Sequence, residues 1–135
     1  MRKGYQLENQ FKRWFKFLND NGVFAIKLQP ERTDSGIRVN GEPFDAIIIS
    51  KGKTYCFDLK ESQSEKFSLL NAKLHQVKYL KICQDNGAES FFLVYFYTSK
   101  ILIRFDIDVI INALTLKQKT LTADKGIPFD YVSYQ

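Results

Sequence analysis

Two aspartates and a lysine around a tight turn are the residues best placed to do chemistry in this sequence. Apolar runs containing β-branched and aromatic residues lie on both sides of Lys51-Gly52. A two-residue loop with glycine second favours a β-hairpin, because glycine accepts a positive φ angle. In that register Asp45 lies directly opposite Asp58. Lys60, two residues further along, points to the same face of the strand as Asp58.

This pairing brings two negative charges together and needs a compensating group. Directly opposed residues have Cβ atoms roughly 4.5–5.5 Å apart, and like charges there are destabilising. A shared divalent cation is the simplest explanation. The alternative is a surface ion triad of Asp45, Lys60 and Asp58 without a metal.

Mg²⁺ prefers hard oxygen ligands and usually keeps several waters. Asp45, Asp58 and the backbone carbonyl of Leu59 could supply such oxygens, and Glu8 could bind directly or through water. The metal would polarise a phosphoryl oxygen and acidify a bound water, while Lys60 would orient that water and offset charge in the transition state. The set fits phosphodiester hydrolysis. For Glu8 the alternative is a solvated side chain paired with Lys12, one helical turn away.

The elements that must position these residues follow from the periodicity of the chain. We expect a mixed α/β fold, with a central sheet flanked by helices, in the order α-β-β-β-α-β-β-α. The predicted helices are 4–20, 71–85 with Asn71 as N-cap, and 107–114; the predicted strands are 23–28, the hairpin 44–60, 89–97 and 100–105. Residues 29–43, rich in helix and strand breakers, are the longest predicted irregular segment.

Composition narrows the class of protein. The 135 residues are 44% hydrophobic, which suits one globular domain spanning 1–135 and excludes a disordered chain. Twenty basic and fifteen acidic residues give a net charge of +5, which is compatible with a polyanionic partner. Cys56 and Cys83 stand at no metal-ligand spacing and are interpreted as reduced, buried thiols of a cytoplasmic protein. No signal peptide or membrane span is expected.

The acidic and lysine pattern resembles the PD-(D/E)XK nuclease superfamily. Pro43-Phe-Asp45 and Asp58-Leu-Lys60 stand where that superfamily has its first acid and its Asp/Glu-x-Lys. The downstream chain is similar to RecU-type Holliday-junction resolvases, and the N-terminal Arg2-Lys-Gly4 with Glu8 is similar to the archaeal resolvases. The matching downstream segments are Phe57–Ser62, Phe67–Asn71, His75-Gln76, Asn86–Phe96 and Lys125–Pro128.

The resemblance implies a restriction-endonuclease-like core and a Mg²⁺-dependent endonuclease, with Mn²⁺ able to substitute. It also implies a homodimer that cuts two opposed strands of a four-way DNA junction, of the compact kind found in phages or mobile elements. Its catalytic residues would be Glu8, Asp45, Asp58 and Lys60. RecU-type enzymes have a long stalk before the first catalytic aspartate, where this chain has only residues 29–43, and they more often have Glu where Asp58 stands.

Phosphate contacts are the expected role of a set of basic residues: Lys3, Lys12, Arg13, Lys16, Arg32, Arg38, Lys51 and Lys53. Gln76 is a further candidate for substrate binding. Two other functions stay open on the sequence. One is a less selective or restriction-like nuclease of the same fold, and the other is a DNA-binding module without catalysis.

Overall fold

The computed structural model describes residues 3–28, 31–32, 38–40 and 42–131, with side chains for 7–28 and 42–131. In these residues the helices are α1 (Lys3–Asp20), α2 (Leu74–Asp85) and α3 (Ile107–Thr115), with short 3₁₀ turns η1 (Leu69–Asn71) and η2 (Ala123–Lys125). The strands are β1 (Phe24–Lys27), β2 (Glu31–Arg32), β3 (Arg38–Asn40), β4 (Ala46–Ser50), β5 (Lys53–Ser62), β6 (Lys66–Ser68), β7 (Glu89–Phe96), β8 (Ile101–Asp106), β9 (Thr120–Thr122) and β10 (Ile127–Pro128).

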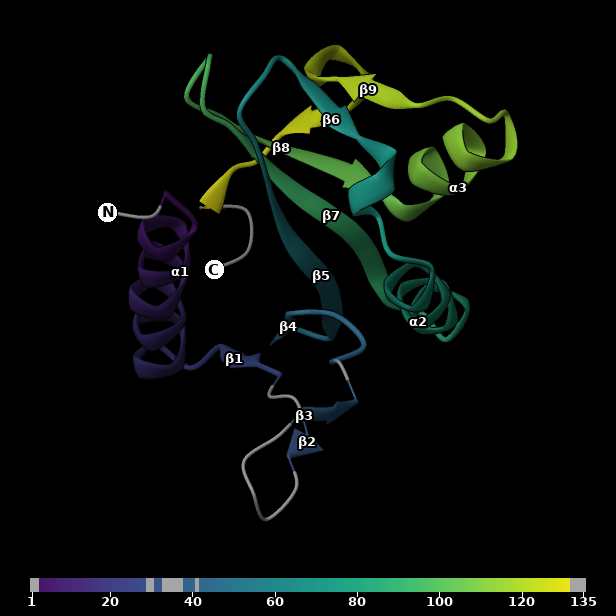
Figure 1. Cartoon of the computed structure of the whole chain (residues 1–135). Coiled ribbons are helices and arrows are strands. Elements are labelled where there is room, and N and C mark those ends of the chain that lie inside the picture. Colours follow the sequence, from purple (N-terminus) through teal and green to yellow (C-terminus); the bar gives the residue numbers. More distant parts are fainter. Residues whose placement is uncertain (1–2, 29–30, 33–37, 41, 132–135) are drawn as a thin grey trace.

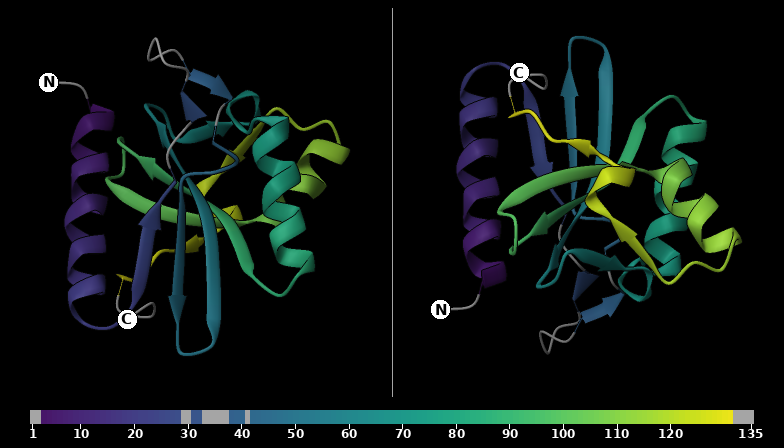
Figure 2. Two further views of the ribbon diagram at one scale, coloured as in Figure 1. Left: turned by 90° about the horizontal axis from the view of Figure 1, so that it is seen from below. Right: turned by 90° about the horizontal axis from the view of Figure 1, so that it is seen from above.

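A six-stranded mixed sheet forms the centre of the molecule, in the order β1-β4-β5-β7-β8-β10. Strands β5 and β7 run parallel and are connected through α2, while the other neighbours are antiparallel. Helix α1 lies on one side of this sheet, and α2 and α3 lie on the other (Figures 1 and 2). The predicted mixed fold with flanking helices is therefore confirmed.

Two apolar cores hold these layers together. The stripe of α1, which includes Phe11, Phe15 and Leu18, packs on the side chains of Phe57 and Phe91 from the sheet. The opposite core joins α2, α3 and the other face of the sheet, and Cys56 of β5 and Leu80 of α2 both belong to it. Consecutive β5 side chains therefore point into different cores, as strand alternation requires.

The β4–β5 hairpin has the register expected from its turn. Lys51 and Gly52 both adopt positive φ angles, 50° and 82°, as a two-residue type I′ turn requires. Ser50 pairs with Lys53, and the ladder continues to the pair Ala46 and Phe57. Ile49, next to the turn, is 44% exposed, because the tip of the hairpin extends past α2 (Figure 2).

Several local predictions were wrong. Asn71 lies in η1 and does not cap α2, which begins at Leu74. Leu74, the first residue of α2, is 79% exposed and lies outside the apolar cores. The segment predicted to be irregular contains the short antiparallel pair β2–β3, which lies away from the main sheet (Figure 1). Strand β6 pairs with β9, more than fifty residues later, in a small second sheet.

Candidate active site

Asp45 lies at the point where β4 diverges from β5. The backbone N–H of Asp45 donates to the carbonyl of Phe57 at 3.2 Å, and β4 itself begins one residue later. Two residues further along β5, the backbone N–H of Leu59 has no acceptor on β4. It donates instead to Oδ2 of Asp45 at 2.7 Å. The side chain of Asp45 therefore replaces the missing strand partner and is held beside Asp58.

Asp58 lies on the face of β5 that carries Cys56, and its side chain is only 1% exposed. Oδ2 of Asp58 contacts Nζ of Lys60 at 3.1 Å. Oδ1 is buried without a hydrogen-bond partner among the described residues. A buried carboxylate oxygen without a hydrogen-bond partner is costly, and in native structures such an oxygen commonly binds an ion or a water molecule.

The environment of Asp58 disfavours its charged form. Burial, followed by the neighbouring carboxylate of Asp45, raises the pKa of Asp58 to about 7, and Lys60 opposes that rise. Two acids in contact and a lysine on the same face form the arrangement predicted from the sequence. Perturbed acids of this kind are concentrated at functional sites.

Glu8 lies on the α1 side of this pair of acids. With Lys12, Lys27 and Asp45 it lines a small pocket of about 20 Å³, whose wall also includes Leu59. Oε1 of Glu8 is paired with Nζ of Lys27, and this hydrogen bond is the main cause that lowers the pKa of Glu8. The alternative partner considered from the sequence, Lys12, makes only a weaker electrostatic contribution.

The structure therefore brings only part of the predicted set of metal ligands together. Asp45 and Asp58 are in contact, and Asp45 shares a pocket with Glu8. Across the side chains that the structure describes, no group of three His, Cys, Asp or Glu is close enough to hold a metal ion. The chemistry of Asp45 and Asp58, and the unsatisfied oxygen of Asp58 in particular, nevertheless fits a hard divalent cation.

The predicted phosphate-binding residues are distributed unevenly. Lys12 lines the Glu8 pocket, whereas Arg13 is exposed on α1 and Lys16 is paired with Asp20 at 2.7 Å. Lys51 and Lys53 lie at the tip of the hairpin, and Lys53 is about 17 Å along β5 from Asp58 at ~3.4 Å per residue. The side chains of Lys3, Arg32 and Arg38 lie outside the described residues.

Gln76 has a structural contact at the start of α2. Its side chain is 9% exposed, and Oε1 accepts a hydrogen bond from the backbone N–H of Lys73 at 3.4 Å. This bond satisfies a helix N-terminal donor. His75 is exposed beside it.

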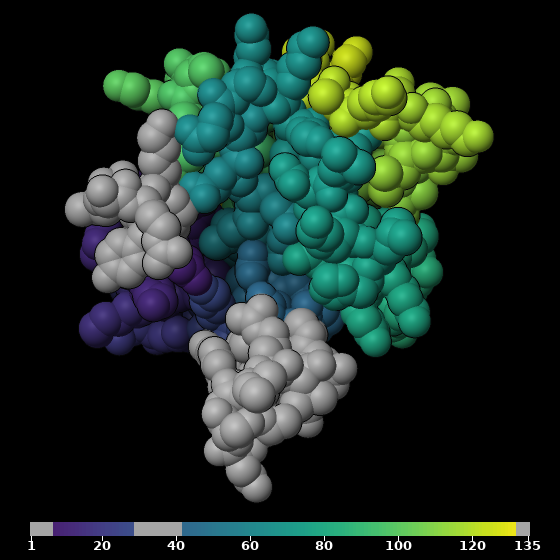
Figure 3. Space-filling model, viewed as in Figure 1, coloured from purple at the N-terminus to yellow at the C-terminus, as the bar shows by residue number. Residues whose placement is uncertain are grey.

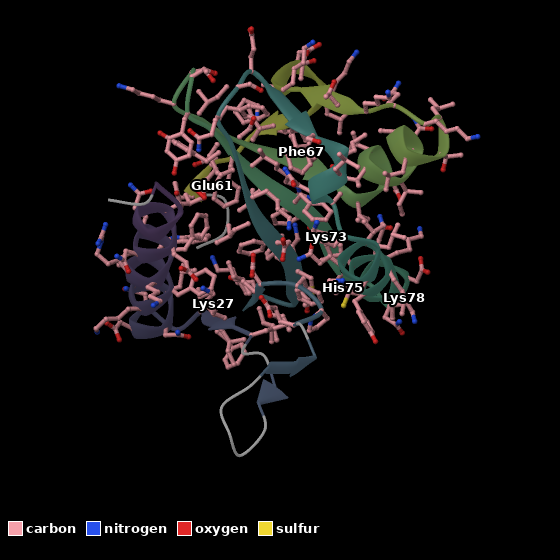
Figure 4. The ribbon with its side chains drawn as sticks, in the orientation of Figure 1. Lys27, Glu61, Phe67, Lys73, His75 and Lys78 are labelled. Carbon is pink, nitrogen blue, oxygen red and sulfur yellow. The ribbon has the colours of Figure 1, made fainter. Side chains whose placement is uncertain are left out.

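The face between α1 and α2 is hollowed over β5 (Figure 3). Lys27 and Glu61 lie on the α1 side of this hollow, and Lys73 and His75 lie on the α2 side (Figure 4). Lys27 was not selected from the sequence as a site residue. The end of the predicted strand 23–28 was the available signal, because alternation places Lys27 on the face of Ala25, which packs against α1.

The mixed sheet, with Asp45 preceding one strand of a hairpin and Asp58-Leu59-Lys60 in the next, defines a nuclease-type fold of the PD-(D/E)XK superfamily. The family model described as RecU, Recombination protein U, matches residues 40–135, and the chain belongs to this family. Among solved structures, the chain is similar to Hjc, a Holliday junction resolvase from the archaeal hyperthermophile Archaeoglobus fulgidus. The TM-score is 0.57 at 15% identity over 89% of this chain and 94% of that chain. A search of the curated proteins gives no match.

Among the described residues, no helix is long and apolar enough to cross a membrane.

Proposed function

We propose that this protein is a Mg²⁺-dependent, structure-selective DNA endonuclease that resolves Holliday junctions by hydrolysing phosphodiesters at the crossover. The observation that carries the proposal is the buried Asp58, in contact with Asp45 and 3.1 Å from Lys60. Membership of the RecU family and the fold shared with an archaeal resolvase support it. We therefore expect the protein in the cytoplasm, where its DNA substrate is located.

The metal would be held by Asp45, Asp58 and the backbone carbonyl of Leu59, with Glu8 binding directly or through water. When bound, Mg²⁺ polarises the phosphoryl group and lowers the pKa of a coordinated water. Mn²⁺ could substitute, because it accepts the same oxygen ligands.

The residues around the metal have separable roles. Asp45 is oriented by the hydrogen bond that Leu59 donates to its Oδ2, and its Oδ1 would serve as the ligand. The ammonium group of Lys60, 17% exposed and in contact with Asp58, would orient the attacking water and stabilise negative charge on the phosphate in the transition state. Of the predicted DNA contacts, Lys12 lines the pocket that Glu8 and Asp45 share.

A homodimer follows from the proposed reaction. Resolution of a four-way junction needs two cuts related by two-fold symmetry, and a two-fold dimer places two identical sites accordingly. Phe11, Trp14, Phe91 and Phe105 are buried in the two cores and are not available to a dimer interface.

The test is cleavage of a synthetic four-way junction, a flapped duplex and a linear duplex of the same sequence, each with Mg²⁺ and with EDTA. We expect symmetric nicks in the junction, at least tenfold slower cutting of linear DNA, and no cutting in EDTA. Equal cutting of all three substrates would favour the less selective nuclease. Tight DNA binding without cutting in Mg²⁺ or Mn²⁺ would favour a non-catalytic DNA-binding module.

A further inference from the structure

Lys27 is held beside the first catalytic aspartate by the backbone of β1. It pairs in register with Ala46, the residue after Asp45. The next residue, Leu28, donates its N–H to the carbonyl of Asp45 at 2.7 Å. The base of the Lys27 side chain is therefore fixed relative to Asp45, and only the flexible end of the side chain can move.

The ammonium group of Lys27 binds the carboxylate of Glu8. The two side chains are partly exposed, 27% for Lys27 and 47% for Glu8. Both line the small pocket that Asp45 shares, so the ion pair lies next to the pair of acids and is not a remote surface contact. Glu8 comes from α1 and Lys27 from β1, so the ion pair is a direct polar link between α1 and the strand that pairs with β4 of the hairpin.

Glu8 is the acid that the donor set lacks. Asp45 and Asp58 are already in contact, but the third acid is bound to a lysine, and the described residues contain no cluster of three acids. A carboxylate that accepts a hydrogen bond from an ammonium group is a weaker ligand for a cation. Lys27 also adds a positive charge close to where a divalent cation would bind.

We propose that Lys27 is a latch on Glu8: it withholds the third acid from the metal, so that a cation must displace the lysine before Glu8 can join Asp45 and Asp58. The inference rests on the proposed metal site. Lys27 is a positioning residue in this account, because it acts through Glu8. The released ammonium group would then be free beside the site, where a DNA phosphate could replace Glu8 as its partner.

The experiment is calorimetric titration of the metal-free full-length protein with MnCl₂, in the absence of DNA. Lys27→Met keeps the length of the side chain and removes the charge. We expect it to bind Mn²⁺ about three- to tenfold more tightly than the wild type, since both the ion pair and the repulsion are lost. Lys27→Gln should show the same direction. General damage to the fold would weaken binding, so the sign of the change separates a latch from a structural role.

Two controls separate the latch from a general effect of charge. Lys12→Met removes a lysine from the same pocket without breaking the pair, and we expect it to change the affinity less than Lys27→Met does. In a Glu8→Gln background, Lys27→Met should increase the affinity by a smaller factor than it does in the wild type, because only the repulsion between Lys27 and the cation remains to be removed.

Each contrary result has its own meaning. Equal or weaker Mn²⁺ binding by both Lys27 variants, or an equal gain in Lys12→Met, would overturn the latch while leaving the proposed function intact. Absence of Mn²⁺ binding by the wild type and all variants would overturn the metal site and the latch together.

Discussion

The carboxylate of Asp45 accepts a 2.7 Å hydrogen bond from the backbone N–H of Leu59, the residue between Asp58 and Lys60. The side chain of Asp45 thus satisfies a backbone N–H of β5. It also places a negative charge next to Asp58. The strand ladder ends at Ala46 and Phe57. The structural and chemical roles of Asp45 can therefore be separated by substitution.

Asp45→Asn should be tolerated better than Asp45→Ala. Asparagine keeps an oxygen that can accept from Leu59, whereas alanine leaves that N–H without its acceptor, at a cost of about 1–3 kcal/mol. Both variants remove the same negative charge next to Asp58, so their difference isolates the hydrogen bond. Urea unfolding at neutral pH measures it. Equal stability of the two variants would show that water replaces the side chain without cost.

Asp58 should make the metal-free protein less stable as pH rises. Its pKa is about 7 in the folded chain, above the ordinary value of 3.8. Between these values the folded state binds more protons than the unfolded state, so the free energy of unfolding falls as pH increases from about 4 to about 7. The contribution is on the order of a few kcal/mol and should be fully lost above pH 7.

Urea unfolding of the wild type and of Asp58→Asn, in EDTA at several pH values between 4 and 8, measures this pH dependence of the free energy of unfolding. The variant lacks the titrating group, so its advantage over the wild type should grow with pH and level off above about pH 7. Glu65→Gln, at an exposed acid, is the matched control and should follow the wild type. If the curves for Asp58→Asn and the wild type stay parallel, the burial of a protonated Asp58 is contradicted.

Glycine should be required at position 126, just before β10, because the backbone there lies close to β8. Its backbone is extended, with φ −120° and ψ −167°, so alanine would cause no conformational strain. A Cβ at this position would instead lie 2.5 Å from Cγ2 of Ile103 and 2.7 Å from the carbonyl oxygen of Arg104. We expect Gly126→Ala to destabilise the fold by about 1–3 kcal/mol through overpacking. Thermal unfolding measures this loss of stability, with Ser99→Ala, in an exposed turn, as the control. An unchanged unfolding midpoint in Gly126→Ala would refute the close contact.

The parts of the fold that sequence could predict are those specified locally. The Lys51-Gly52 turn determines the hairpin register, and through it the meeting of Asp45 with Asp58. The apolar stripe that includes Phe11 and Leu18 predicts both α1 and the face it buries. These features depend on neighbouring residues and on strand and helix periodicity.

The remaining features depend on contacts between distant segments. Asn71 has the side chain of an N-cap, but packing of η1 places it one turn before α2. The pair Glu8 and Lys27 joins two elements, and a helical pattern alone points to Lys12 as the partner. The need for glycine at position 126 comes from Ile103 and Arg104, which no local pattern connects to it.

The central claim, that Asp45 and Asp58 form a metal-dependent site for phosphodiester hydrolysis, is tested most directly by junction cleavage with Asp58→Asn. Single-turnover rates on a four-way junction are measured at saturating Mg²⁺ for the wild type and the variant, after gel-shift assays have shown that both bind the junction. Loss of the buried ligand should lower the rate by at least about 10²–10³-fold while junction binding is retained. A rate within a few-fold of the wild type would contradict the account.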